Sequence, residues 1–255
     1  MTRPVPPWAA TLAIIGALLM GVPLVALMLR VPWLDVPRLL VSPAAVDALW
    51  LSLRTCLAST VLCLLLGLPL ALALSRLRGR WMAIGRVLAT VPMVLPPVVA
   101  GLALLVTFGR RGLIGQVLSL GGIEIGFTTI AVVVSQTFVA MPFLVVAVEG
   151  ALRSVDGDAE LMAATLGAGP SRVLWQVTVP ALRPAIVSGT SLAAARALGE
   201  FGATVTFAGS LQGTTRTLPL EIYLQREVDT DTSLALAAVL IGLAALLVLA
   251  TGVLG

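Results

Sequence analysis

Residues 49–74 read LWLSLRTCLASTVLCLLLGLPLALAL, an apolar run in which a helix has more than the length needed to cross the hydrocarbon layer of a bilayer. A helix rises 1.5 Å per residue and the layer is ~30 Å thick, so about 20 apolar residues suffice. Similar apolar runs lie at about 8–29, 87–108, 127–148, 184–207 and 233–254. We therefore predict an all-α integral membrane protein with six transmembrane helices in a single domain over residues 1–255.

The composition supports this class and excludes several others. Of 255 residues, 59% are hydrophobic and 11% are charged, whereas soluble domains average about 45–50% and about 25%. There is no His, which excludes Ser-His-Asp catalysis and His-ligated metal or haem, and no Lys, which excludes a phosphate-binding P-loop. Any ATP must therefore be hydrolysed by another chain. Cys56 and Cys63 lie seven residues apart on one helix face, too far apart for a disulfide, and we expect buried, unreactive thiols.

Arginine placement predicts the orientation. The loop after residue 74 has no acid and carries Arg76, Arg78, Arg80 and Arg86. The loop before the last run pairs Arg216 and Arg226 with Glu221, Glu227, Asp229 and Asp231. The positive-inside rule then places the first of these loops, and with six spans both termini, in the cytoplasm. The net charge of +4 therefore reflects topology rather than nucleic-acid binding, because the arginines are scattered. We expect the first run to be a retained span rather than a signal peptide, and no regulatory domain after the last.

The third run contains Pro92, Pro96 and Pro97. Proline removes a backbone donor and clashes with the preceding turn, so this span is predicted to be kinked or broken near its start. Such breaks occur in membranes where neighbouring helices or a water-filled cavity satisfy the freed backbone groups. The prolines indicate either a packing kink or a segment that lines a pathway.

Residues 149–183 form a connection too long for a simple turn, with signals for two short helices. Asp158 is predicted to cap the first, Glu160 lies in its first turn, and residues 167–170 end it. Ser171 is predicted to cap the second, which Pro180 ends. Apolar surface on this hairpin comes from Leu161, Leu166, Leu174 and Trp175. The pattern fits either an amphipathic hairpin lying against the membrane or an element that docks into a groove on a soluble partner.

The sequence of this hairpin resembles the EAA loop of ABC-importer permeases. ELMAATLGAG at 160–169 and VTVP at 177–180 follow the family spacing of Glu-Ala-Ala, three residues, Gly, nine residues and Ile-x-Leu-Pro. Leu161 and Met162 depart from it, because they stand where the pattern has Glu and Ala. The resemblance implies that this loop is the cytoplasmic coupling helix between helices 4 and 5, with contributions from Glu160, Ala163, Ala164, Gly167, Ala168, Gly169, Pro170 and Pro180.

Two further stretches are similar to molybdate or tungstate permease subunits: ARALGEFGATVTF at 195–207 and TRTLPLEIY at 215–223. The ALGEFG core also occurs in the related sulfate/thiosulfate permeases, and the threonine-rich extensions favour molybdate, with tungstate and sulfate left open as alternatives. The resemblance implies a type I ABC importer permease whose core covers residues 49–254, in a bacterial plasma membrane. It further implies a homodimer, two cytoplasmic ATPase subunits that hold ATP and Mg, and an extracytoplasmic oxyanion-binding protein. No cofactor, catalytic residue or metal ligand is expected in this chain.

Arg196 and Glu200 lie four residues apart within the fifth run, on one helix face. A charge at the bilayer centre costs about 2.5–3.5 kcal/mol on insertion scales, so neither side chain should face lipid. They form either an ion pair that only packs the bundle or part of a translocation path in which Arg196 binds an oxyanion. Thr204 and Thr206 are possible further donors on that path, although threonine also joins membrane helices.

Functions of other classes remain open at this point. An intramembrane protease lacks a His partner for any Ser. A passive channel needs no docking hairpin, and an ion-coupled secondary transporter needs an ionisable residue near mid-membrane, for which Glu200 is the candidate. Dependence of uptake on ATP rather than on a proton gradient would separate these from an ABC permease.

Overall fold

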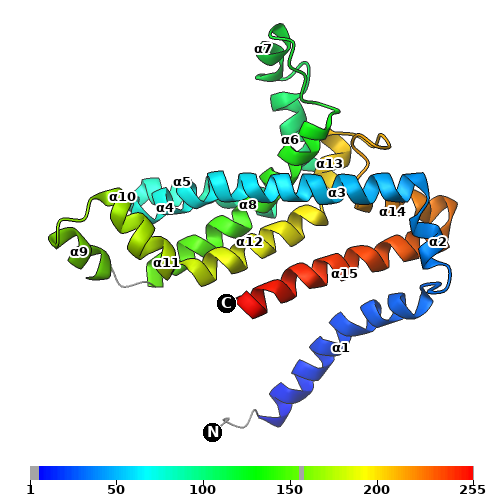
Figure 1. Cartoon of the computed structure of the whole chain (residues 1–255), viewed down its shortest axis with the longest axis horizontal. Helices are drawn as coiled ribbons and strands as arrows, with labels where there is room; N and C mark the ends of the chain where they lie inside the picture. The colour runs from blue at the N-terminus through cyan, green and yellow to red at the C-terminus, as the bar shows by residue number, and fades with distance from the viewer. Residues whose placement is uncertain (1–5, 155–157, 255) are drawn as a thin grey trace.

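The computed structural model describes residues 6–154 and 158–254, and within these ranges the chain forms helices and turns without a strand (Figure 1). The helices, in chain order, are α1 (Pro7–Arg30), α2 (Val36–Leu40), α3 (Pro43–Leu62), α4 (Leu68–Arg76), α5 (Gly79–Val94), α6 (Pro97–Phe108), α7 (Gly115–Leu120), α8 (Thr129–Ser154), α9 (Asp158–Thr165), α10 (Pro170–Val173), α11 (Val179–Ala181), α12 (Arg183–Leu198), α13 (Gly202–Phe207), α14 (Leu218–Val228) and α15 (Thr230–Leu254). Two π-helical turns, η1 (Cys63–Gly67) and η2 (Leu174–Thr178), join α3 to α4 and α10 to α11.

Four helical segments of the described chain are long and apolar enough to cross a membrane: α1, the continuous α3–η1–α4, α8 and α15. They cover the runs predicted at 8–29, 49–74, 127–148 and 233–254. The π turn η1 ends two residues before Pro69, whose ring would clash with a carbonyl in a regular helix. The widened turn lets α3 and α4 act as one helix of 34 residues despite this proline.

The predicted third span is broken. Helices α5 and α6 meet at an angle of 115°, with the break at residues 95–96. Leu95 and Pro96 have extended backbones, as expected before a proline, and Pro97 begins the new helix where its missing N–H costs nothing. Pro92 stays inside α5. The prediction of a broken span is therefore confirmed, and the break follows from the adjacent pair of prolines.

The predicted fifth span, 184–207, is also not one helix. Helix α12 ends at Leu198 and α13 begins at Gly202, with three residues between them outside any helix. The 16 residues of α12 rise about 24 Å, less than the hydrocarbon layer. Counting the bent α5–α6 pair as one span gives five. The count of six requires both halves of this broken helix together and stays a prediction.

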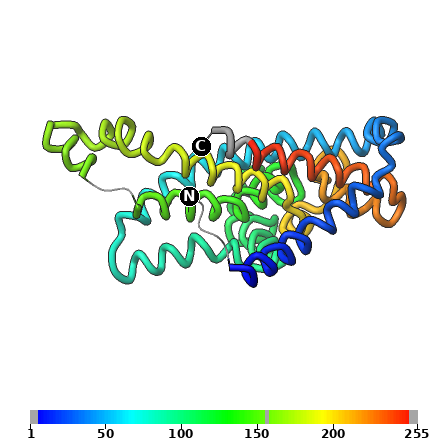
Figure 2. Tube along the Cα trace, turned by 90° about the horizontal axis from the view of Figure 1, so that it is seen from below, coloured from blue at the N-terminus to red at the C-terminus, as the bar shows by residue number. Residues whose placement is uncertain are grey.

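Helix α8 lies at the centre of the bundle and contacts α3, α4, α5, α12 and α13. Its closest partner is α12, against which Ala140 and Leu144 pack with Ala193 and Ala197 in one buried cluster. Gly189 allows this approach, because a Cβ there would lie 2.9 Å from the Cβ of Ala147. Figure 1 shows α3, α8, α12 and α15 running along the length of the molecule, while α1 diverges and α6–α7 projects to one side; Figure 2 shows the same elongated bundle from below.

The two ends of the bundle differ. One end carries the turn from α4 to α5, with its arginines, and the hairpin of α9 and α10; α2 and the junction of α14 with α15 lie at the other (Figure 1). At that second end Asp229 precedes α15 and accepts hydrogen bonds from the Thr232 hydroxyl and the Asp231 amide, which lower the pKa of its carboxyl. The arginine loop and the hairpin thus share one end, as the predicted topology requires.

An ion-pair cluster joins α5 to α8 at the hairpin end. Glu149 of α8, with a side chain 5% exposed, lies 2.7 Å from Arg86 of α5 and 3.0 Å from Arg153. We expect Glu149→Gln to lower the thermal unfolding midpoint of the purified protein, because hydrogen bonds to charged groups contribute about 1.5–3 kcal/mol. The control is Glu124→Gln, which breaks an exposed pair with Arg110 worth about 0–1 kcal/mol. Equal shifts for both variants would contradict a stabilising role for the buried cluster.

Candidate functional site

The first arm of the hairpin is α9, which ends in a well-formed helix stop. Helix α9 begins at Asp158, so that Asp158 and Glu160 both lie in its first turn, where the helix dipole favours acids. Asp158 is therefore a helical residue rather than the predicted cap. At the other end Gly167 has a φ of +84°, the Ala168 N–H donates to Ala163 and the Gly167 N–H donates to Ala164. This pair of bonds is the Schellman motif, which requires the left-handed conformation that glycine adopts most readily.

The second arm differs from the prediction at both ends. Gly169 precedes α10 and Pro170 is its first residue, so Ser171 is inside the helix and the predicted Ser171 cap is wrong. Proline suits this first position because its missing N–H has no helical partner there. Pro180 does not end the helix either: the π turn η2 precedes it, and only a turn at Leu182 separates α11 from α12. As at Pro69, a π turn accommodates the proline.

One contact ties the two arms together. The Thr178 hydroxyl donates to the Glu160 carboxylate across 2.5 Å, and Thr178 is 3% exposed. Glu160 lies one residue before the position of the glutamate in the family pattern. Its carboxylate thus joins the two arms of the hairpin. The surface of the hairpin remains apolar: exposed side chains include Leu161, Met162, Leu166 and Trp175. Ala163, Ala164 and Ala168 add small side chains close to the Gly167 turn, which leaves the helix backbone open to close approach.

The second part of the site is the break between α12 and α13, where Arg196 and Glu200 form an ion pair. Arg196 Nη2 lies 2.7 Å from Glu200 Oε2, and their side chains are 29% and 1% exposed. Glu200 Oε1 accepts a hydrogen bond of 2.8 Å from the Ala203 N–H in the first turn of α13. Arg196 lies in the last turn of α12 and Glu200 just before α13, so each charge complements the dipole of its helix end.

The two broken helices pack against each other. A Cβ on Gly202 would lie 2.5 Å from the Cβ of Pro97, and one on Gly101 would lie 2.9 Å from the carbonyl oxygen of Ala203. The glycines therefore bring α6 and α13 into direct backbone contact. Beside this junction is a hollow of about 370 Å³ lined by Pro97, Val98, Arg196, Gly199, Glu200, Phe201 and Gly202. Paired discontinuous helices with an ionisable group between them are typical of binding sites in membrane transporters.

The two threonines of α13 lie elsewhere. Thr204 is fully buried, and its hydroxyl lies 3.3 Å from that of Ser135 on α8. Because Ser135 donates to the Ala131 carbonyl, Thr204 is the donor of this inter-helix bond. Thr206 donates to the Gly202 carbonyl within α13. Both hydroxyl hydrogens are thus used in packing, and neither residue lines the hollow beside Arg196.

Gln136, next to Ser135 on α8, is a residue that the sequence reasoning passed over. It is 1% exposed, and neither its amide nitrogen nor its amide oxygen has a hydrogen-bond partner among the described residues. An unpaired buried amide costs about 1–3 kcal/mol per group. The presence of a long polar side chain in this apolar span could therefore have identified Gln136 as a candidate functional residue from the sequence.

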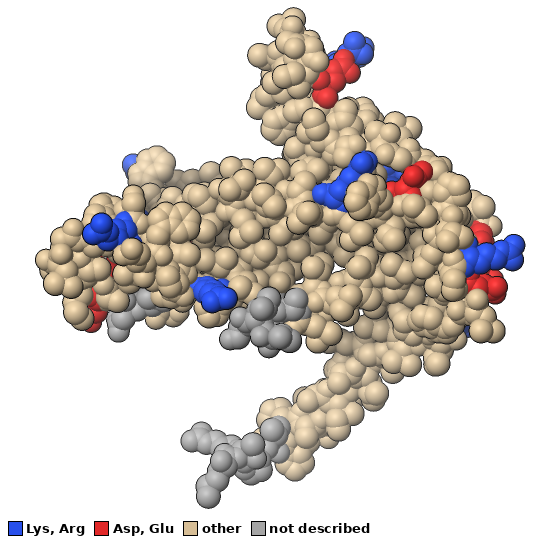
Figure 3. All heavy atoms as spheres, viewed as in Figure 1, with Lys and Arg blue, Asp and Glu red and all other residues tan. Residues whose placement is uncertain are grey.

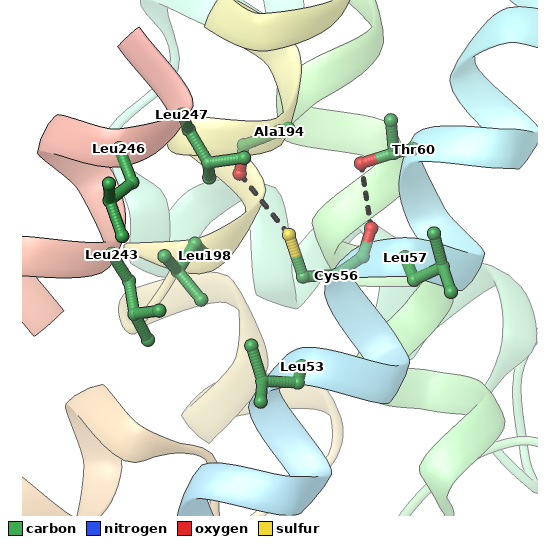
Figure 4. A pocket seen from close by; sticks show the side chains of 9 residues that line it. All are labelled: Leu53, Cys56, Leu57, Thr60, Ala194, Leu198, Leu243, Leu246 and Leu247. Carbon is green, nitrogen blue, oxygen red and sulfur yellow. Dashed lines mark hydrogen bonds between the residues drawn. The ribbon is translucent and has the colours of Figure 1, made fainter. Parts of the chain in front are cut away.

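The cysteines lie apart from these two elements. Cys56 and Cys63 are buried and unpaired, as predicted. The Cys56 thiol donates to the Ala194 carbonyl across 3.4 Å and borders an apolar cavity of about 330 Å³ among α3, α12 and α15 (Figure 4). Its walls include Leu53, Leu198 and Leu246, and among the described residues that line it there is no charged group that would activate the thiol.

The comparisons with known proteins define the class. Residues 64–254, well over half of the chain, match the family described as "Binding-protein-dependent transport system inner membrane component". The chain belongs to this family and has the fold of type I ABC importer permeases, which makes it a multi-pass protein of the plasma membrane. In the solved structure of a bacterial ABC transporter involved in the import of the acidic polysaccharide alginate, a chain of 17% identity superposes with a TM-score of 0.70 over 96% of this chain and 93% of that one.

Within the family, the chain is 55% identical to the molybdenum transport system permease protein ModB of Mycobacterium tuberculosis, over 97% of this chain and 94% of that protein. It is 36% identical to the sulfate transport system permease protein CysW of Synechococcus elongatus, over 74% of this chain and 68% of that protein.

Proposed function

We propose that this chain is the transmembrane subunit of an ATP-driven importer and forms the alternating-access path for an oxyanion, molybdate in particular. The observation that carries the proposal is the 55% identity over nearly the whole length of a molybdenum permease, against 36% over a shorter stretch for a sulfate permease. Tungstate has the same shape and charge and is expected to share the path. Sulfate/thiosulfate transport is the alternative.

In the working complex, two copies of this chain pair with two cytoplasmic ATPase subunits and receive the anion from an extracytoplasmic binding protein. ATP and Mg are held by the ATPases. The apolar hairpin supports this assembly, since Leu161, Met162 and Leu166 are exposed beside a sharply ended helix and fit the helix-in-groove mode of docking. This assignment places the hairpin end, and with six spans both termini, in the cytoplasm.

The path is proposed to pass the junction of the two broken helices. Glu200 is buried and fixed by α13, whereas Arg196 is 29% exposed and faces the hollow, so the guanidinium can exchange part of its contact for an anion. The Thr204 hydroxyl bonds to Ser135 and the Thr206 hydroxyl bonds within α13, so a role of either as a further donor on the path stays a prediction. A modest site in the path suits transport, because strong binding there would slow release.

The test is a competition experiment on the reconstituted complex. Uptake of labelled molybdate driven by ATP should fall with excess tungstate and be little affected by the same excess of sulfate. Equal inhibition by sulfate would favour the sulfate alternative. Uptake that stops when the proton gradient is dissipated, with ATP still present, would instead indicate an ion-coupled transporter.

A further inference from the structure

The hairpin end of the molecule carries a cluster of arginines that lack acidic partners. Arg76, Arg78 and Arg80 are exposed at the turn from α4 to α5, and within the described residues no carboxylate forms an ion pair with any of them. The buried acid at this end, Glu149, is already bound by two other arginines. Figure 3 shows basic groups at this end with acidic groups on the hairpin beside them, and both signs together at the opposite end.

A hollow of about 260 Å³ lies between α4 and the hairpin, bordered by one arginine of this cluster. Its walls are Pro69, Leu72 and Ala73 of α4 and Leu174 of η2, and Arg76 stands at its border. The α4 wall belongs to the helix that runs through the membrane. The hollow is therefore lined by apolar side chains, with one guanidinium group at its border.

Trp81 lies in the first turn of α5, next to these arginines in the sequence. Its indole is 62% exposed, and the guanidinium carbon of Arg80 lies 5.5 Å from the centre of its ring. Tryptophan is enriched where lipid headgroups meet hydrocarbon, and the contact with Arg80 is a cation–π interaction. This combination is typical of a membrane interface, and Arg76 follows Leu72 of the apolar recess by one helical turn.

We propose that this recess binds an anionic phospholipid, with the lipid phosphate against Arg76 and Arg78 and one acyl chain along Pro69 and Leu72. Charge complementarity requires an anion, and the membrane-embedded wall requires that the anion carry hydrocarbon. An acidic surface of a soluble partner meets the first requirement but not the second. Since Leu174 forms part of the recess, the bound lipid also braces the hairpin from its membrane side. The proposal needs only that α3–η1–α4 spans the membrane, and it is independent of the transported anion.

Native mass spectrometry of the full chain in detergent tests the proposal, with dioleoyl phosphatidylglycerol and dioleoyl phosphatidylcholine added in equal amounts. The wild-type protein should retain phosphatidylglycerol preferentially. Arg76→Gln combined with Arg78→Gln should reduce that preference by about twenty-five-fold, since each arginine near an anionic surface contributes about 1 kcal/mol, or about fivefold. Arg76→Lys keeps the charge and should keep most of the preference.

The matched control is Arg111→Gln, an exposed arginine of the α6–α7 loop away from the recess, which should leave the preference unchanged. Circular dichroism confirms that each variant keeps its helices. An equal preference in the double variant and the wild type would overturn the proposal, and so would an equal loss in the Arg111 control. Loss of binding to an ATPase subunit with lipid retention unchanged would also overturn it, because the arginines would then face a protein.

Discussion

Gly167→Glu is expected to leave the protein inserted in the membrane and to reduce oxyanion uptake by at least about tenfold. Gly167 ends α9 at a φ of +84°, where a residue with a Cβ costs roughly 1–2 kcal/mol, or about 5–30-fold in the population of the closed hairpin. The new carboxylate also introduces a charge into the apolar surface formed by Leu161, Met162 and Leu166. Uptake into proteoliposomes and capture of the ATPase subunit, measured on the same preparation, check this result.

Gly169 offers a matched control within the same turn. Its φ of −68° is ordinary for any residue, and a Cβ at either glycine would meet no atom within 4 Å. Gly167→Ala should therefore lower uptake severalfold while Gly169→Ala leaves it unchanged, because the two differ in backbone strain and not in space. If Gly167→Glu transported normally while still binding its ATPase, the docking role of the hairpin would be refuted.

The hairpin around these two glycines was predicted from the sequence only in part. The stop at residue 167 is encoded locally, by residues 167–170, and the structure has it where it was predicted. The start and end of the second arm were predicted wrongly, because Ser171 and Pro180 were judged by rules for regular α-helices. The π turn at 174–178 has no comparable local signal, although a proline inside a strongly helical segment leaves few other solutions.

The contacts of the candidate path could not be predicted from local sequence either, because they depend on the tertiary structure. The prolines at 96 and 97 predict a break, but nothing near them in the sequence indicates that Gly202, more than 100 residues later, packs on Pro97. Helical spacing predicts that Arg196 and Glu200 share a face. It does not predict that α12 ends at Leu198 and α13 begins at Gly202, so that the same carboxylate caps the next helix. Thr206, read as a donor to the path, donates to the carbonyl four residues earlier, a local bond that threonine forms in helices of any length.

Arg196→Gln and Glu200→Gln, made singly and together, are expected to separate a packing role from a path role. Either single change leaves one charge of a largely buried pair uncompensated, which typically costs about 3–5 kcal/mol and should reduce assembly of the complex. With both changes the site becomes neutral, and the amide oxygen at position 200 can still accept the Ala203 N–H. The double variant should therefore assemble better than either single variant.

Uptake by the double variant then decides the role of Arg196. If the guanidinium contacts the anion, uptake should stay at least about tenfold below wild type although assembly recovers, because a charge-assisted hydrogen bond contributes about 1.5–3 kcal/mol. Arg216 and Glu221 supply the control: they are 20% and 1% exposed and lie 3.3 Å apart, so the same pair of substitutions there removes an ion pair of similar burial outside the hollow. That double variant should recover both assembly and uptake. Wild-type uptake with Gln at both 196 and 200 would mean that the pair only joins α12 to α13, and that the anion crosses the bundle elsewhere.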